Sequence, residues 1–177
     1  MDSLEAVVAV YDDWGIGAEG TQPLTLRADR LRFRHLTEGA AILVGSRTLA
    51  DFPGGRPLKN RVNIVLSRRS PEIPGAVVVE SVAEALAEAE RHPRTLVVGG
   101  ARVYAALLPY VSRVHVTRIE ALPRSDVFFP DLDALPEWER EPEEETGEED
   151  GVHYRFLTYR RGGGWLVGGA DAGNLIQ

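Results

Sequence analysis

Short apolar runs recur along this chain, and stretches with helical patterns separate them. The runs cover residues 4–11, 41–44, 62–66 and 96–98, with a weaker candidate at 76–79. Near-continuous runs of this length are typical of strands buried on both faces of a parallel sheet. Ser81 and Glu84 have the spacing of a capping box, which predicts a helix between two of these runs. The alternation predicts one α/β domain, with a central, mainly parallel sheet flanked by helices and ligands at the strand carboxyl ends.

The carboxyl-terminal part differs because it lacks helical patterns. Candidate strands at residues 138–145 and 152–160 flank a stretch, 146–151, that contains two Gly. This pattern predicts an antiparallel hairpin on the sheet edge. Its many carboxylates would keep the edge solvated, and a contact surface for a partner is the alternative. We expect the domain to cover residues 1–161 and the remaining residues, 162–177, with six Gly, to form a flexible tail.

Charge and composition exclude several classes of partner. The 27 acidic and 20 basic residues give a formal charge of -7. Residues 137–150 hold eight Glu, one Asp and one Arg, so the rest is nearly neutral and lacks the basic face that binds duplex nucleic acid. No apolar run approaches the ~20 residues of a membrane span, and the acidic amino terminus is unlike a secretory signal. We therefore expect a cytoplasmic monomer that acts on a small molecule.

Several kinds of catalytic site are also excluded. The chain has no Cys, which rules out disulfides and thiol chemistry. Its four His are scattered, and no acidic loop has the calcium-binding spacing, so no metal is expected. A Gly-x-Ser-x-Gly elbow is absent as well, which leaves a serine hydrolase little support.

A Gly-rich loop, residues 12–20, follows the first apolar run. It lacks the Gly-x-Gly-x-x-Gly spacing of a dinucleotide-binding turn and the Lys of a phosphate loop. Gly permits the backbone angles that a lid needs to close over a ligand, although an ordinary turn would use the same residues. We interpret this loop, together with the residues that follow it up to Leu24, as a mobile lid, with a plain turn as the alternative.

A carboxylate stands in an apolar helical row after this loop. Leu26, Asp29, Phe33 and Leu36 recur at helical spacing. One explanation is structural, since an Asp in the first turn is favoured by the helix dipole and by Arg32 three residues later. The other is functional: a desolvated carboxylate needs a partner, and a heterocycle with two N–H donors would provide one.

Groups suited to phosphate follow three of the expected strands. Gly99-Gly100 lies between the run at 96–98 and a helical stretch, where backbone N–H groups can bind phosphate. Arg47-Thr48 and Ser67-Arg68 follow two other runs. Together they favour a dinucleotide with a 2′-phosphate, and the alternative is that the Arg side chains are solvated surface charges.

These segments, in this order and spacing, resemble dihydrofolate reductase over about residues 4–161. The resemblance rests on the following motifs: Val8-Ala9-Val10, Trp14-Gly15-Ile16-Gly17, Asp29 with Leu31-Arg32-Phe33-Arg34, Val44-Gly45-Ser46-Arg47-Thr48, Gly55-Arg56-Pro57-Leu58, Arg61-Val62-Asn63-Ile64-Val65-Leu66-Ser67, Val98-Gly99-Gly100 and Phe129-Pro130-Asp131.

The resemblance implies NADPH-dependent reduction of dihydrofolate, with hydride transfer to pterin C6. Asp29 matches the family's single active-site acid, which binds the pterin and promotes protonation of N5, and Thr117 matches the Thr that supports it. The other implied substrate contacts are Val8, Phe33 on the folate rings, Leu58 along the aminobenzoyl path and Arg61 on the glutamate α-carboxylate. The implied cofactor contacts are Ala9, Ile16, Gly17, Arg47, Thr48, Ser67, Arg68, Val98, Gly99, Gly100, Arg102, Val103 and Tyr104.

Some positions depart from the family's pattern, more on the substrate side than on the cofactor side. Leu24 stands where Trp is usual, Arg27 where Pro is common, and Arg30 where an apolar residue normally faces the folate. The stretch 51–55 is about two residues longer than usual. We therefore expect an altered response to antifolates.

Two alternatives remain open. One is a reductase of the same fold that acts on another heterocycle, as in riboflavin synthesis. Those enzymes resemble the cofactor half but lack the pattern of Asp29 with Arg61. The other is a module that binds NADPH without catalysis.

Overall fold

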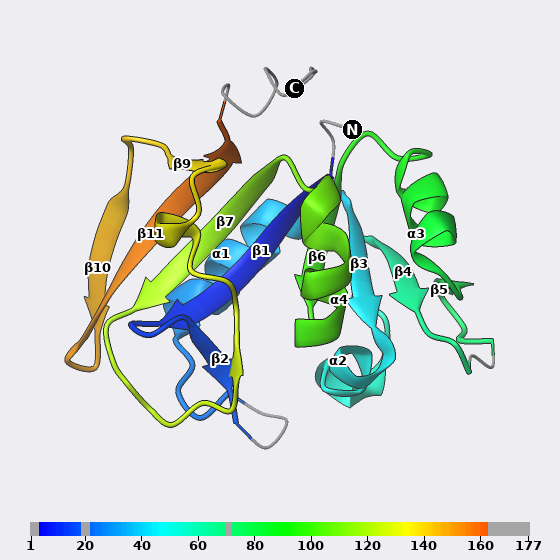
Figure 1. The fold of residues 1–177 in the computed structure, drawn as a ribbon. Coiled ribbons are helices and arrows are strands. Elements are labelled where there is room, and N and C mark those ends of the chain that lie inside the picture. Colours follow the sequence, from blue (N-terminus) through cyan, green and yellow to red (C-terminus); the bar gives the residue numbers. More distant parts are fainter. Residues whose placement is uncertain (1–3, 19–21, 70–71, 163–177) are drawn as a thin grey trace.

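A single large sheet forms the centre of the molecule (Figure 1). The computed structural model describes residues 4–18, 22–69 and 72–162. The strands lie in the order β10-β11-β7-β1-β6-β3-β4-β5, with β9 paired to β11. Their bounds are β1 (Leu4–Tyr11), β3 (Ala41–Gly45), β4 (Val62–Leu66), β5 (Ala76–Val79), β6 (Thr95–Gly99), β7 (Arg113–Ile119), β9 (Trp138–Arg140), β10 (Glu145–Glu149) and β11 (Val152–Arg161).

All neighbours from β7 to β5 pair in parallel, whereas β11 is antiparallel to β7, β9 and β10. A second sheet of two strands joins β2 (Gly15–Gly17) to β8 (Val127–Phe128). The helices are α1 (Arg27–Thr37), α2 (Ser46–Ala50), α3 (Val82–Ala89) and α4 (Ala101–Leu107), with 3-10 turns at Pro53–Gly55, Leu108–Tyr110 and Leu132–Ala134. The predicted α/β fold class is confirmed.

Alternation along the strands separates the core into two layers. The larger cluster includes Val8 and Val10 of β1 with buried residues of α3 and α4. Ala9 and Tyr11, which point the other way, pack with Leu26 beside α1. In Figure 1, α1 accordingly lies behind β1 and β7, and α4 lies in front of β6. A sheet buried on both faces explains the near-continuous apolar runs of the sequence.

The Ser81 half of the capping box predicted for α3 is present, and the Glu84 side chain reaches one residue farther back than predicted, to Glu80. The Ser81 hydroxyl accepts a hydrogen bond from the Glu84 N–H at 3.1 Å. The Glu84 carboxylate accepts one from the Glu80 N–H at 2.9 Å.

The carboxyl-terminal hairpin differs in register from the prediction. Residues 138–145 were expected to form its first strand, but β10 begins at Glu145 and continues through the predicted turn to Glu149. The turn itself is Asp150-Gly151, both with positive φ. Residues 138–140 instead form β9, which pairs with the far end of β11. The predicted tail, apart from Gly162, lies outside the described residues and stays a prediction.

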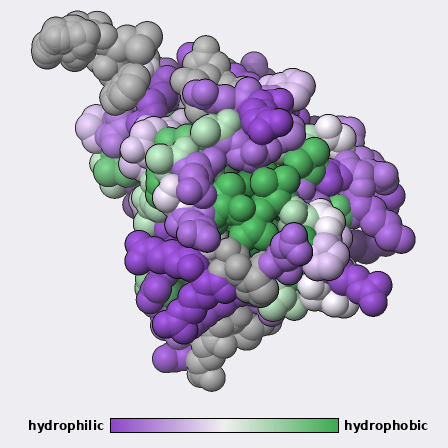
Figure 2. Space-filling model, turned by 90° about the vertical axis from the view of Figure 1, so that its right-hand side faces the viewer, coloured by the Kyte–Doolittle hydropathy of each residue, from purple (hydrophilic) through white to green (hydrophobic). Residues whose placement is uncertain are grey.

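The opposite edge of the sheet has an apolar surface. Figure 2 shows apolar side chains gathered in the middle of this face, with hydrophilic residues around them. Val62 of β4 and Val77 of β5 are both 38% exposed. The edge strand β5 has only four residues, and a short edge strand limits pairing with other chains. None of the described helices is long and apolar enough to cross a membrane.

A partly buried ionic cluster ties β1 to its neighbours near their amino ends. The Glu5 carboxylate lies 2.6 Å from His115 Nε2 and accepts a hydrogen bond from Arg94 Nη2 at 2.9 Å. Arg94 also donates to the Leu36 carbonyl near the end of α1, at 3.2 Å. Burial raises the pKa of Glu5, but the hydrogen bonds from His115 and Arg94 outweigh it and bring the pKa to about 2.

We predict that Glu5→Gln lowers the free energy of unfolding by about 2 kcal/mol near neutral pH, because charge-assisted bonds are lost. The folded-state pKa lies below the ordinary value of 4.5. The stabilisation is therefore complete above that value and disappears as pH falls toward about 2.

Urea unfolding of both proteins at several pH values measures this. The difference should be constant down to about pH 5 and shrink below it. A difference in free energy of unfolding that did not depend on pH would contradict the assignment of this stabilisation to the ionised Glu5 carboxylate. Glu139→Gln, in a surface pair with Arg160, serves as the control with little expected change.

Candidate active site

Asp29 lies in the first turn of α1, facing the sheet. It is half-buried, and Thr117 of β7, which is 2% exposed, donates a hydrogen bond to its carboxylate. Burial raises the pKa of Asp29, while Thr117, Arg32 and Arg30 act in the opposite direction. The net direction is upward, so this carboxyl group holds a proton at a higher pH than an exposed Asp does. The structure thus brings together the two residues predicted to be catalytic.

Arg32 is fixed beside Asp29 by the carboxyl-terminal part of the sheet. Its guanidinium carbon lies 4.5 Å from the centre of the Phe156 ring, and Nη1 donates to the Val116 carbonyl at 3.1 Å. Burial lowers the pKa of Arg32, and the charges of Asp29 and Glu145 raise it. A permanently charged group is therefore held near the carboxylate and favours its ionised form.

A chain of hydrogen bonds joins Phe33 and Arg61, which were both predicted to bind substrate. The Thr37 hydroxyl donates to the Phe33 carbonyl at 2.8 Å and accepts from Arg61 Nε at 2.8 Å. Arg61 Nη1 donates to the Lys59 carbonyl at 2.8 Å. Within the described ranges, Arg61 forms no ion pair with a carboxylate. Burial lowers the pKa of Arg61, and the charge of Glu38 nevertheless acts on this side chain and raises that pKa.

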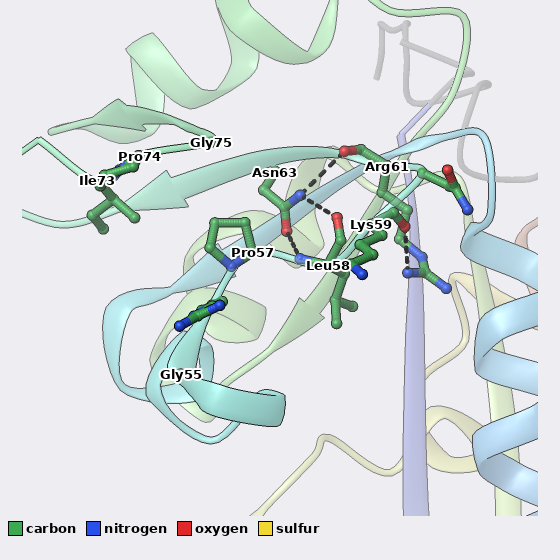
Figure 3. A pocket seen from close by; sticks show the side chains of 11 residues that line it. Gly55, Pro57, Leu58, Lys59, Arg61, Asn63, Ile73, Pro74 and Gly75 are labelled. Atoms are coloured by element: carbon green, nitrogen blue, oxygen red, sulfur yellow. Dashed lines mark hydrogen bonds between the residues drawn. The ribbon is translucent and has the colours of Figure 1, made fainter.

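Asn63 holds the loop that carries Leu58 and Arg61, as Figure 3 shows. Its side chain is 2% exposed and contacts backbone groups alone. The amide oxygen accepts from the Leu58 N–H at 2.9 Å, and the amide nitrogen donates to the carbonyls of Leu58 and Arg61 at 2.9 and 3.1 Å. Beside the loop lies an open groove of about 640 Å³ that does not include Asp29. It is lined by residues 55–61, Asn63 and residues 73–75.

β1 and β6 separate toward their carboxyl ends. Residues 4–6 pair with residues 95–97, although β1 continues to Tyr11 and β6 to Gly99. Side chains satisfy the carbonyls that lose their partner strand: the Tyr104 hydroxyl donates to Val7 O at 2.6 Å, and Gln22 Nε2 donates to Ala9 O at 3.1 Å. Burial, and then the charge of Asp29, raise the pKa of Tyr104, which keeps this donor protonated.

The predicted substrate contact at Val8 stays a prediction. Its side chain is 4% exposed and packs in the larger cluster, on the sheet face away from α1. Val7 and Ala9 point toward the face of α1 instead. A continuous apolar run does not reveal which residues face which side.

Gly99 and Gly100 form a narrow turn between β6 and α4. They are joined by a cis peptide bond, and Gly99 has φ +128°. A Cβ at Gly100 would lie 3.0 Å from Thr48 Oγ1, and one at Gly45 would lie 3.0 Å from Val103. Gly100 and Thr48, both predicted to hold the cofactor's phosphates, thus lie close together, and a side chain at Gly100 would require Thr48 to move.

The other predicted cofactor residues surround this turn or the lid. Ile16 and Gly17 lie in β2 of the lid, where Gly17 O accepts from the Asp126 N–H at 2.8 Å. Residues 19–21 of the lid lie outside the described ranges. Arg47, Arg68 and Arg102 are exposed, Ser67 and Val98 are half-buried, and Val103 and Tyr104 are buried.

Sequence reasoning also missed residues that position the site. Asn63 and Gln22 act on backbone groups, and Glu149 accepts hydrogen bonds from the N–H groups of Arg27 and Ala28 at 2.7 and 2.9 Å. No local pattern marks such contacts. Among the described residues, no group of three or more His, Asp or Glu could hold a metal ion.

Comparisons with known proteins agree with this geometry. The family model described as Dihydrofolate reductase matches residues 3–161. The dihydrofolate reductase of Mycobacterium tuberculosis is 40% identical over 151 residues, covering 82% of this chain and 90% of the relative. That of Gallus gallus is 36% identical over 183 residues, covering 90% and 96%.

A solved structure of dihydrofolate reductase from Enterococcus faecalis, complexed with NADP(H) and RAB-propyl, superposes with a TM-score of 0.78. It is 30% identical, and the match covers 89% of this chain and 95% of that one. With the Asp29–Thr117 pair and the glycine turn in place, the chain belongs to the dihydrofolate reductase family.

Proposed function

We propose that this protein reduces 7,8-dihydrofolate to 5,6,7,8-tetrahydrofolate with NADPH. The observation that carries this proposal is the Asp29 carboxyl group, half-buried, bonded to Thr117 and raised in pKa. Its partner Thr117 lies opposite Ala9 of β1, in the part of β1 that no longer pairs with β6 and near the carboxyl ends of these parallel strands. Ligands of open parallel sheets bind at such places.

Asp29 would bind the 2-amino group and ring nitrogen of the pterin. This places an ionisable group with an upward-shifted pKa next to a ring that must gain a proton at N5. Thr117 orients the carboxylate, and Arg32 moderates its pKa. One tuned acid is enough because the remaining chemistry belongs to the cofactor.

The rest of the substrate would extend along α1. Phe33 is placed to pack on the folate rings, Leu58 to line the aminobenzoyl path and Arg61 to bind the glutamate α-carboxylate. Asn63 and Thr37 hold the last two in position through the hydrogen bonds described above.

The glycine turn fits a dinucleotide cofactor, since a side chain at Gly100 would meet Thr48. Gly99, Gly100 and Thr48 would hold the pyrophosphate, Arg47, Ser67 and Arg68 would hold the 2′-phosphate, and Ala9, Ile16 and Tyr104 would lie beside the nicotinamide. NADPH supplies the hydride when bound. The lid would exclude water, and its contact with Asp126 anchors the strand that carries Ile16.

We further propose that the enzyme is a cytoplasmic monomer whose domain covers residues 1–161, with 162–177 as an appended tail. The near-neutral charge outside residues 137–150 supports a small-molecule substrate rather than nucleic acid.

Asp29→Asn should lower the rate of dihydrofolate reduction at least about 100-fold while leaving NADPH affinity nearly unchanged, because only the proton-handling group is removed. In the unchanged enzyme the rate should fall as pH rises through the raised pKa of Asp29, and the variant should lack this dependence. Single-turnover NADPH oxidation over a pH series measures both. Asp51→Asn, at an exposed position, is the control, and full activity in Asp29→Asn would exclude the proposed role.

Arg32→Met should move the fall in rate to higher pH. Without this charge the ionised form of Asp29 is less favoured, so its pKa rises further. The same pH series measures the shift, with Arg34→Met as a matched control on the exposed side of α1. An unchanged pH profile in Arg32→Met would show that the charge does not act on the reacting carboxyl group.

Arg61→Ala should weaken dihydrofolate binding by about 2 kcal/mol through loss of a charge-assisted hydrogen bond. A pterin substrate without the glutamate tail should be nearly unaffected. Steady-state kinetics with both substrates test this, and Arg56→Ala, which lines the groove from an exposed position, is the control. Equal losses with both substrates would point to general damage to the fold.

A further inference from the structure

The helix that carries Asp29 has no capping residue of its own. The residue before its first turn is Leu26, which provides no side-chain hydrogen bond. Leu26 is 3% exposed and packs with Tyr11 and Ile119, so this position is committed to the core. The first N–H groups of a helix nevertheless need acceptors, and a cationic residue such as Arg27 at this end is unfavourable to the helix dipole.

Glu149 supplies the missing acceptors from the other end of the chain. Its Oε2 accepts from the Arg27 N–H at 2.7 Å, and its Oε1 accepts from the Ala28 N–H at 2.9 Å. Each oxygen contacts a different amide, which fixes the direction of the helix end as well as its position. The next residue is Asp29. The bonds from Arg27 and Ala28 hold the pKa of Glu149 below its usual value, so the carboxylate stays ionised at neutral pH.

The position of Glu149 is itself fixed relative to Thr117. Glu149 is the last residue of β10 and pairs with Val152 of β11 across the Asp150-Gly151 turn. β11 pairs with β7 so that Phe156 lies opposite Thr117. The cap and the hydroxyl that binds Asp29 therefore belong to one continuous group of paired strands.

α1 contacts this group at a second point, because Arg32 stacks on Phe156. The first two turns of the helix are thus held by the hairpin on both sides of Asp29. A shift of the hairpin end would move the amino terminus of α1 while Thr117 stayed in β7.

We propose that Glu149 is a positioning residue for Asp29: its carboxylate caps α1 and holds the Asp29 carboxyl group against Thr117. The inference rests on the proposed function, since it assigns Glu149 to the proton-handling step. It also gives the acidic carboxyl-terminal hairpin a role beyond protection of the sheet edge.

The test compares Glu149→Gln with Glu148→Gln in the full chain. Gln keeps the size of Glu149 but lacks the charge and one acceptor oxygen. Glu148 is the matched control, because it is exposed and lies 3.7 Å from the exposed His153. Three quantities are measured: hydrogen exchange of the Arg27 and Ala28 amides, the single-turnover rate of dihydrofolate reduction, and the affinity for NADPH.

In Glu149→Gln we expect faster exchange of both amides and a reduction rate about tenfold lower, with NADPH affinity within about twofold, since only the acid is misplaced. Glu148→Gln should match the unchanged protein in all three. Faster exchange with an unchanged reduction rate would overturn the proposal, because the cap would then be structural alone. The proposal would also be overturned by unchanged exchange of the Arg27 and Ala28 amides, or by a loss of NADPH affinity as large as the loss of reduction rate.

Failure of the proposed function would appear elsewhere. The unchanged protein would then fail to oxidise NADPH with dihydrofolate, or Asp29→Asn would keep full activity. A loss of activity confined to Glu149→Gln, in a protein whose turnover depends on Asp29, supports the positioning role specifically.

Discussion

The separation of β1 from β6 is the constraint on which the site depends. Two buried parallel strands that stop pairing leave backbone carbonyls without partners, and such groups are costly unless other donors reach them. Tyr104 and Gln22 provide these donors to Val7 and Ala9. Each comes from a different segment, α4 and the end of the lid. The gap is therefore stabilised by the elements that surround it, and they are fixed at the place where a ligand can enter the sheet.

The face of β7 toward α1 anchors both ends of that helix. Thr117 contacts Asp29 in the first turn, and His115, two residues earlier, contacts Glu5, which also binds Arg94. Arg94 then reaches the Leu36 carbonyl near the last turn. The structure shows that one face performs two tasks, a reactive contact at one end and a structural ion cluster at the other.

Local patterns predicted the parts of the structure that depend on local physics. The apolar runs became β1, β3, β4 and β6, and the capping box at Ser81 formed as predicted, because each depends on neighbouring residues. The resemblance of motifs predicted that Thr117 supports Asp29. The first strand of the hairpin was misplaced, since residues 138–145 and Glu145–Glu149 have similar charge and only pairing with β11 distinguishes them.

Contacts that no local sequence pattern marks could not be predicted. Asn63 acts on Leu58 and Arg61 through backbone groups, and a buried Asn in an apolar strand has no pattern that reveals its partners. The faces of β1 were also ambiguous. Val7 and Val8 are both buried, but they point to opposite layers, and the alternation is visible only once α1 and α4 are in place.

α1 shows most clearly why the site belongs to the tertiary structure. Within 11 residues it carries four Arg and one His, an arrangement that an isolated helix would tolerate poorly near its amino end. External groups hold the helix in place. Glu149 at the first N–H groups and Phe156 on Arg32 offset the positive charge, whereas Arg61 on Thr37 and Arg94 on Leu36 bind groups near the carboxyl end. Every one of these contacts joins α1 to a different part of the chain. The direction of Asp29 is therefore set by the assembled fold, which is why a carboxylate at helical spacing could be recognised in the sequence while its environment could not.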